Sequence, residues 1–250
     1  MKRLITIIWM FIGLAINAQS NKVLFEQANQ LYQNADYKNA IANYQKIAKS
    51  GKHSDALYFN LANAYYKLNE VAPAIYYYEK ALKLNPLHED AKYNLVLANR
   101  MSIDQIDEMP KTLIQRIETN FLHKISVETW SIIAVVLSFL TALLFLIYYF
   151  SFSTLLKQLF FTISIVTFSM MIITVLIAIK GVNYEKNHRP AIIFSEKAVI
   201  KNAPTFNSED VFILHEGTKV DVLDTVDDWY KIKLVDGKIG WVKTSVLKII

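Results

Sequence analysis

The chain has 250 residues, of which 53% are hydrophobic and 20% are charged. That balance is too apolar for an ordinary soluble globule, and it indicates that part of the chain lies in lipid. There is no cysteine, which excludes disulfides, thiol catalysis and cysteine-ligated zinc.

The net charge of +5 comes from residues outside the two segments whose composition is typical of folded domains. Residues 19–110 hold ten basic and ten acidic side chains, and residues 191–250 hold eight lysines and nine acidic side chains. The remainder holds nine basic and three acidic side chains, close to apolar segments. This placement suits anionic lipid headgroups, whereas a nucleic-acid-binding protein gathers its cations on one face of a folded domain. Membrane lipid is therefore an expected partner, and nucleic acid is not.

The first apolar segment has the order of a secretory signal. Two basic residues precede a run from Leu4 to Ile16, and Asn17-Ala18-Gln19 follow. We expect a signal peptide over residues 1–18, with cleavage after Ala18. Ile16 is a less usual residue two places earlier, so retention as an anchor stays open. In both cases the residues that follow are exported.

Residues 130–150 and 159–179 are two further apolar segments, each of 21 residues without charge. A helix of that length spans roughly 30 Å, the thickness of the hydrocarbon core. Aromatic residues stand at the ends of the first segment, at Trp130 and Tyr148-Tyr149, where interfacial rings belong. The sequence predicts two transmembrane helices joined by a short cytoplasmic loop, residues 151–158.

Two signals disagree about the orientation of this hairpin. Export places both flanking parts in the periplasm and makes the chain a multi-pass protein of the bacterial inner membrane. The positive-inside count opposes this, because the loop holds only Lys157 and the outer flanks hold Lys124, Lys180, Lys186 and Arg189. We follow the amino-terminal signal, since the first apolar segment usually sets the orientation.

Residues 19–101 repeat themselves. A shift of 34 residues aligns Ala28 with Ala62, Asn29 with Asn63 and Tyr44 with Tyr78. The spacing resembles the tetratricopeptide repeat, on the residues Leu61, Ala62, Tyr65, Ala74, Tyr78, Ala81 and Pro86. We expect about two helical repeats, in which the small residues let helices pack closely and most tyrosines fill the core. Glu89–Arg100 supplies a third first-helix that caps the stack, and Ala35 stands where the family has a turn glycine.

The resemblance implies a concave groove lined by the first helix of each repeat. The residues it would turn toward a partner protein are Phe25, Asn29, Tyr32, Phe59, Asn63, Tyr66, Lys67, Tyr93 and Arg100. Aromatic and amide side chains there suit an extended peptide or a partner helix. The alternative is that these residues serve only solubility and stacking.

Residues 191–250 change to short β-rich runs separated by turns. Tyr230, Ile232 and Leu234 alternate with lysines, which predicts a strand with one buried face, and a hairpin turn is expected at Asp236-Gly237. The region resembles a bacterial SH3 domain, on Lys201, Pro204, Glu216-Gly217-Thr218, Trp229-Tyr230 and residues 236–242. Members of that family bind cell-wall peptide or proteins, or are only structural. Trp229 and Trp241 are possible ligand contacts, or packed residues of the barrel.

The connecting segments are residues 102–129 and 180–190. The acidic residues Asp104, Asp107 and Glu108 are expected to be solvated, and Glu79, Lys80 and Lys83 of the repeat to lie on its surface. No phosphate-binding loop, H-E-x-x-H pair or G-x-S-x-G elbow is present, and the five histidines lie far apart. The apolar segments carry hydroxyls but no charge, which disfavours transport. We expect a protein that is not an enzyme and has no catalytic residues, no cofactor and no metal.

The predicted fold class is thus a multidomain membrane protein: an all-α tetratricopeptide repeat, a transmembrane helical hairpin and a small all-β SH3-like barrel. This order of parts resembles the BatE proteins of bacterial aerotolerance (Bat) operons. The resemblance implies von Willebrand A-domain membrane proteins and a MoxR-type ATPase as partners, in an envelope complex for stress tolerance. The function expected is a membrane-anchored scaffold that presents two protein-binding modules in the periplasm. A peptidoglycan-binding tether or sensor is the alternative. A transmembrane receptor is disfavoured, because no cytoplasmic domain is expected.

Overall fold

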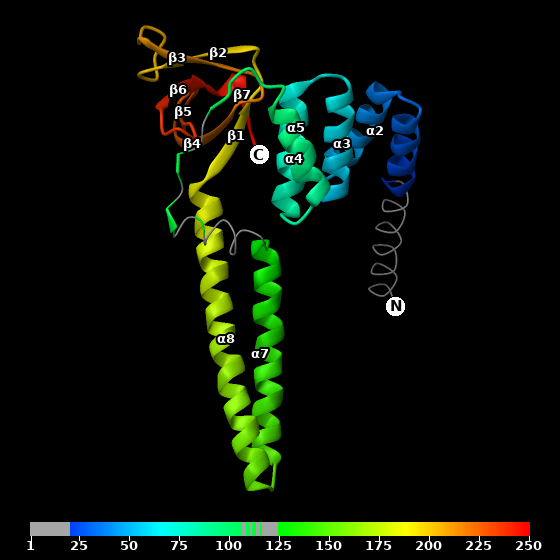
Figure 1. Ribbon diagram of the computed structural model, residues 1–250, viewed down its shortest axis with the longest axis vertical. Coiled ribbons are helices and arrows are strands. Elements are labelled where there is room, and N and C mark those ends of the chain that lie inside the picture. The colour runs from blue at the N-terminus through cyan, green and yellow to red at the C-terminus, as the bar shows by residue number, and fades with distance from the viewer. Residues whose placement is uncertain (1–20, 107–108, 111, 114–115, 117–124) are drawn as a thin grey trace, which may run out of the picture. The chain divides into compact units, whose positions relative to one another are not determined.

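A computed structural model describes residues 21–106, 109–110, 112–113, 116 and 125–250 (Figure 1). The expected signal peptide lies outside the described residues. The chain forms two compact units, Met1–Glu108 with Pro190–Ile250, and Met109–Arg189. The first unit contains both the helical repeats and the β-sheet.

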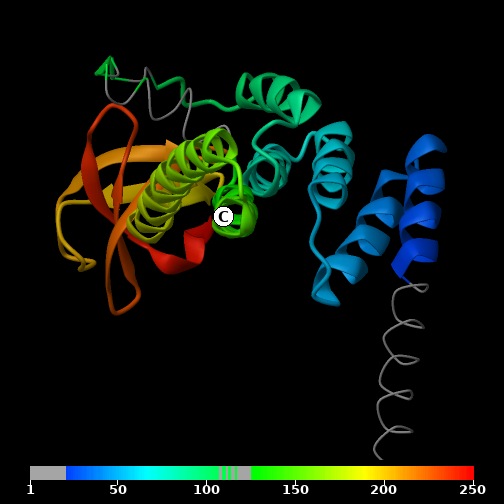
Figure 2. The same ribbon diagram turned by 90° about the horizontal axis from the view of Figure 1, so that it is seen from below.

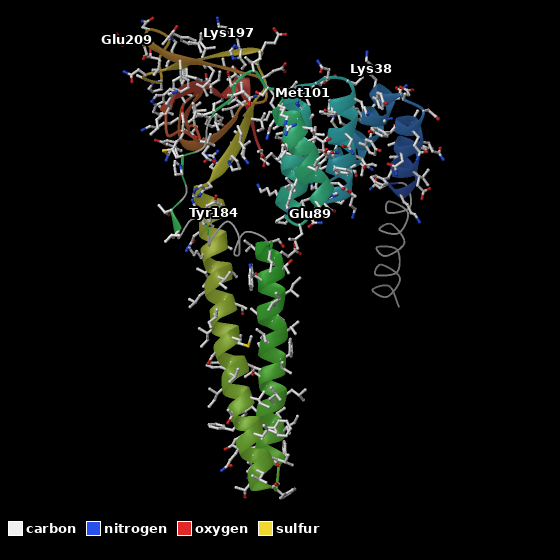
Figure 3. The ribbon with its side chains drawn as sticks, in the orientation of Figure 1. Lys38, Glu89, Met101, Tyr184, Lys197 and Glu209 are labelled. Carbon is white, nitrogen blue, oxygen red and sulfur yellow. The ribbon has the colours of Figure 1, made fainter. Side chains whose placement is uncertain are left out.

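The repeat consists of short helices that follow one another in chain order, coloured from blue to green in Figures 1 and 2. Residues 21–33 are helical. The helices that follow are α2 (Tyr37–Lys49), α3 (Asp55–Lys67), α4 (Val71–Leu84) and α5 (Glu89–Asn99). Side chains cap three of these helices, since Asp36, Ser54 and His88 each accept a hydrogen bond from the N–H three residues later. Glu89 and Met101, labelled in Figure 3, mark the start of α5 and the turn just beyond its end.

Small side chains stand where the helices of the repeat pack most closely. Ala28, Ala62 and Ala74 are at most 1% exposed, and the rings of Tyr44 and Tyr78 are equally buried. The buried positions of the alanines are as predicted, whereas of the repeat's tyrosines only Tyr44, Tyr58 and Tyr78 are buried and others, such as Tyr65 and Tyr77, are partly buried against the core.

Two turns of the repeat use the left-handed backbone region without glycine. Ala35 has φ 60° and Asn69, 34 positions later, has φ 62°. Asparagine tolerates this region, whereas the Cβ of alanine costs about 1–2 kcal/mol there. The backbone at Ala35, where the family has a turn glycine, is therefore strained.

The second unit contains the helical hairpin of α7 (Val127–Phe150) and α8 (Thr154–Asn187). The two helices lie side by side in both views of the ribbon (Figures 1 and 2), and Thr141 Oγ1 donates a 3.0 Å hydrogen bond to Thr167 Oγ1 between them. Mean hydropathy reaches 2.6 and 2.4, so both helices are long and apolar enough to cross a membrane. Their apolar side chains are mostly exposed, unlike those of a soluble core helix. Both helices extend beyond the predicted spans, and only three residues, 151–153, connect them.

Seven antiparallel strands form one sheet in the order β3-β2-β6-β5-β4-β1-β7. Their bounds are β1 (Arg189–Ile193), β2 (Lys197–Lys201), β3 (Asp210–His215), β4 (Lys219–Val226), β5 (Trp229–Lys233), β6 (Ile239–Lys243) and β7 (Leu247–Ile249). Ile232 and Leu234 are buried as the alternation predicts. Strand β1, which no strand pattern in the sequence predicts, begins at Arg189 and pairs with β7. With the repeats and the two apolar helices, this sheet confirms the predicted fold class.

The repeat and the sheet share a core within the first unit. Ile192 of β1 is fully buried in the same cluster as Ile75 and Tyr78 of α4. Ile106, beyond the last repeat helix, packs in turn against the core of the sheet. The two modules therefore form one packed body.

Candidate protein-binding groove

A pocket of about 250 Å³ lies in the helical repeat. It is lined by Tyr32, Asn63, Tyr66, Lys67, Tyr78, Asn94 and Leu97. Four of these residues, Tyr32, Asn63, Tyr66 and Lys67, belong to the groove set that the resemblance implied. We call this pocket with its lining the repeat groove.

A hydrogen-bonded ladder of asparagine and tyrosine forms the wall of the repeat groove. Asn63 Oδ1 accepts from the Tyr78 hydroxyl at 2.5 Å and from Asn94 Nδ2 at 2.9 Å. The same arrangement occurs 34 residues earlier, where Asn29 Oδ1 accepts from the Tyr44 hydroxyl at 2.6 Å and from Asn60 Nδ2 at 3.0 Å. Each helical repeat thus orients one asparagine through a tyrosine and a second asparagine.

This ladder determines which hydrogen-bonding groups of the groove are available to a ligand. The carbonyl oxygen of Asn63 already accepts two hydrogen bonds, so the donor side of the amide is the part left for a ligand. Among the hydrogen bonds of the described residues, none involves Asn63 Nδ2. Burial raises the pKa of Tyr44 to about 12 and raises that of Tyr78 further, which keeps both hydroxyls protonated as donors.

The charge of the groove is positive. Lys67 is the cation of its lining, and the lining contains no carboxylate. Together with the amide and the tyrosine hydroxyls, this lining suits a ligand rich in acceptors, such as the main chain or a carboxylate of an extended peptide.

The other predicted partner-binding residues lie outside the pocket lining. Phe25 packs edge-on against Tyr44 at 5.8 Å, and Phe59 lies 4.7 Å from the His88 ring. Asn29 belongs to the ladder, and both rings belong to the packing between helices. Tyr93 is 66% exposed and Arg100 forms the carboxyl-terminal cap of α5, so neither is brought to the pocket.

Three lining residues were not among the predicted groove residues: Tyr78, Asn94 and Leu97. Tyr78 is one of the tyrosines that fill the core, since its side chain is buried, and its hydroxyl donates to the ladder. The 34-residue shift aligns Asn60 with Asn94, and this was the signal that could have identified the second asparagine.

The outer side of α4 contacts the sheet, which corrects the surface expectation for Glu79, whereas Lys83 is exposed as expected. Glu79 accepts a 2.7 Å hydrogen bond from the Lys219 ammonium, and its side chain is only 16% exposed. Lys83 donates to the Ile250 carbonyl at 2.8 Å. Lys80 lies over the rings of Tyr58 and Tyr76, at 4.9 and 5.1 Å.

Asp104 is likewise not solvated. Its carboxylate accepts from the His215 N–H at 2.6 Å, from His215 Nδ1 at 2.8 Å and from the Thr218 hydroxyl at 2.6 Å. Burial disfavours the charge, but the hydrogen bonds from Thr218 and His215 outweigh it, so the pKa of Asp104 lies below its usual value. The residue joins the end of the repeat to the sheet. Asp107 and Glu108 lie outside the described residues.

The two predicted tryptophans of the sheet have different environments. Trp229 is 6% exposed, with the Phe206 ring 5.4 Å away and the Lys243 ammonium 4.8 Å from its centre. Trp241 is partly exposed, and the Lys231 ammonium lies 5.9 Å from its ring. Only Trp241 offers a ring to a ligand without rearrangement.

The described residues contain no group of three or more histidine, cysteine, aspartate or glutamate side chains that could hold a metal ion. His53 pairs with the Tyr58 hydroxyl and His88 caps α5, so these histidines have structural partners.

Comparison with known families agrees with both modules. The tetratricopeptide repeat model matches residues 55–87, and the bacterial SH3 domain model matches residues 198–248. Among characterised proteins, the chain is similar to sperm-associated antigen 1 of Rattus norvegicus, with 34% identity over 79 residues. That match covers 32% of this chain and 9% of the other protein, so the chain spans only a small part of that relative. Both matched modules are of a kind that mediates interactions and not catalysis.

Proposed function

We propose that this protein is a non-catalytic, membrane-anchored scaffold whose repeat groove binds an extended segment of a partner protein. The observation that supports this most directly is the pocket lined by Tyr66, Lys67 and the oriented amide of Asn63. The amide of Asn63 and the cation of Lys67, both on α3, match the acceptors of an extended peptide, and the aromatic rings provide apolar contact.

Anchoring follows from the hairpin of α7 and α8. The repeat and the sheet pack together although this hairpin separates them in the chain. If α7 and α8 each cross the membrane once, the repeat before them and the sheet after them lie on the same side of the bilayer. This agrees with the packing of the two modules against each other. Because the amino-terminal signal exports the repeat, that side is the periplasmic side of the inner membrane.

A Bat-type envelope complex is the setting that the order of modules favours. Its implied partners are von Willebrand A-domain membrane proteins acting with a MoxR-type ATPase. The predicted partner contacts Phe25, Asn29, Phe59, Tyr93 and Arg100 would then extend the interface beyond the pocket, while Tyr66 and Lys67 hold its centre.

The groove is tested by replacing Tyr66 with a photo-crosslinking phenylalanine derivative in the full-length chain in cells. We expect a crosslinked adduct with a second envelope protein, identified by mass spectrometry and lost when Lys67→Glu is added. The same derivative at Val235, which is 39% exposed in the turn between β5 and β6, is the control for general proximity. Adducts at Tyr66 that match those at Val235, or that survive Lys67→Glu unchanged, would count against groove binding.

A peptidoglycan tether is the second candidate, and it is favoured by the accessible ring of Trp241 beside Lys231. Because Ile192 belongs to the core shared with the repeat, binding is measured with the full-length chain in detergent. Retention on purified sacculi that is lost with Trp241→Ala, at unchanged thermal stability, would support the tether. Equal retention of the variant would remove Trp241 from any such role.

A further inference from the structure

Trp229 is buried by a loop and a lysine, although it lies outside the core cluster of the sheet. Phe206 belongs to the segment between β2 and β3, is 70% exposed, and meets the Trp229 ring edge-on at 5.4 Å. In Figure 3, Lys197 and Glu209 mark the two ends of this β2–β3 hairpin. The segment is held by turns of its own, among them Ala203 N–H to Ser208 Oγ at 2.9 Å.

A cation fills the space beside these two rings. The Lys243 ammonium lies 4.3 Å from the centre of the Phe206 ring and 4.8 Å from that of Trp229. Lys243 stands directly opposite Trp229 in the pairing of β5 with β6. The Asp228 carboxylate lies 3.8 Å from the same ammonium, and its side chain is 83% exposed. Two aromatic rings and one carboxylate thus surround a single primary ammonium.

We infer that Phe206, Trp229 and Asp228 form a binding site for a primary ammonium, and that Lys243 is its internal occupant. Aromatic rings and a carboxylate together select a cation and disfavour an anion. A cation–π contact at a partly exposed site is weak, so a peptide that carries a lysine-type amine and makes further contacts replaces Lys243. The site is therefore closed by the chain itself until such a peptide arrives.

This inference is independent of the repeat groove, because no residue of the site lines that pocket. Its ligand chemistry is also opposite, since the groove offers a cation and this site offers a carboxylate with two rings.

The test uses the full-length chain in detergent, labelled with 5-fluorotryptophan. The chain has four tryptophans, and Trp229→Phe identifies the resonance of Trp229 in the fluorine spectrum. The probe is Nα-acetyl-lysine methylamide, and Nα-acetyl-norleucine methylamide is the matched compound without the ammonium. Lys243→Met removes the internal ammonium and keeps the apolar stem.

We expect the lysine probe to shift the Trp229 resonance of Lys243→Met with an affinity at least about tenfold tighter than for the unmodified chain. The norleucine probe should shift it little. Lys233→Met, on the same outward face of β5, should behave like the unmodified chain. Equal affinities in Lys243→Met and the unmodified chain, or equal shifts by the two probes, would overturn the inference. Lys243→Gln serves as a second opening variant if Lys243→Met unfolds.

Discussion

At the scale of single residues, one turn of the repeat holds an alanine where the backbone conformation favours glycine, and this lowers the stability of the fold. The turn before α2 places Ala35 at φ 60°, and the equivalent turn before α4 uses Asn69 at φ 62°. An asparagine side chain tolerates this region, and an alanine side chain gains nothing there to offset its Cβ clash.

Ala35→Gly should therefore stabilise the protein. Relief of the left-handed strain exceeds the added entropy of glycine in the unfolded chain, so we expect a gain of about 0.5–1 kcal/mol in the free energy of unfolding. Chemical denaturation measures it. Asn69→Gly is the matched control and should change stability less, and a loss of stability in Ala35→Gly would contradict this account of the turn.

Asp104 supplies the second residue-scale prediction. Its pKa is lowered in the folded protein, so its contribution is complete above the unfolded-state pKa and is lost as pH falls through the folded value. Asp104→Asn should lower the free energy of unfolding by about 1–3 kcal/mol at pH 7. The difference from the unmodified chain should shrink as the pH falls below about 4, because the aspartate of the unfolded chain then takes up a proton before that of the folded chain does.

Thermal unfolding across pH 3–8 checks this dependence. Asp36 accepts hydrogen bonds from Asn39 at the exposed start of α2, and Asp36→Asn serves as the control. A loss for Asp104→Asn that is the same at pH 3 and pH 7 would show that the carboxylate charge is not what holds the sheet to the linker.

At the scale of elements, helix α4 has two functional sides. Tyr78 reaches the ladder of the repeat groove, while Tyr76, Glu79 and Lys83 contact the sheet. Helix α4 therefore contacts both the repeat groove and the sheet.

The turn between β3 and β4 packs against α4 at Gly217. Its φ is +86°, and an added Cβ would lie 3.0 Å from Ile75 Cδ1 and 3.1 Å from Val71 Cγ1. Gly217→Ala should cost about 1–3 kcal/mol of stability through backbone strain and crowding together.

Gly51→Ala separates the two causes. Gly51 has φ +79°, and nothing lies within 4 Å of its added Cβ, so this variant suffers the strain alone. Chemical denaturation of both variants should show the larger loss for Gly217→Ala. Equal losses would mean that the contact with α4 adds nothing.

At the scale of the whole molecule, the repeat and the sheet form one packed body. The ion pair of Glu79 with Lys219, at 2.7 Å, is one of the contacts that join them. Both modules must share one aqueous compartment if this packing forms in the cell.

The absence of cysteine allows a direct test of that arrangement. Single cysteines replace exposed Lys52 in the repeat, exposed Glu209 in the sheet and Phe152 in the helix connection. In cells with a permeable outer membrane, a membrane-impermeant maleimide should label the first two positions. Phe152→Cys should be labelled only after the inner membrane is opened. Labelling of Lys52→Cys and Glu209→Cys on opposite sides would refute the common compartment.

Charge reversal tests whether the two modules depend on each other. Glu79→Lys and Lys219→Glu should each lower thermal stability, and the double variant should recover part of it, with a coupling of about 0.5–1 kcal/mol. Lys238→Glu, whose partner Asp236 lies in the same hairpin turn, is the control that leaves the joint intact. Strict additivity of the two changes would show that the pair does not couple the modules.

The sequence by itself determined the kinds of module and their order, because each depends on local periodicity. The 34-residue shift, the uncharged 21-residue segments and the alternation at Tyr230, Ile232 and Leu234 each report which face of an element meets water or lipid. The tertiary structure decided which modules touch. Asp104, Glu79 and Lys83 look like solvated charges in sequence, and their partners lie more than 100 residues away. Strand β1 was not predictable for the same reason, because it pairs with β7, which lies far from it in the sequence. The covering of Trp229 by Phe206 and Lys243 likewise depends on strand register, which a short sequence window does not contain.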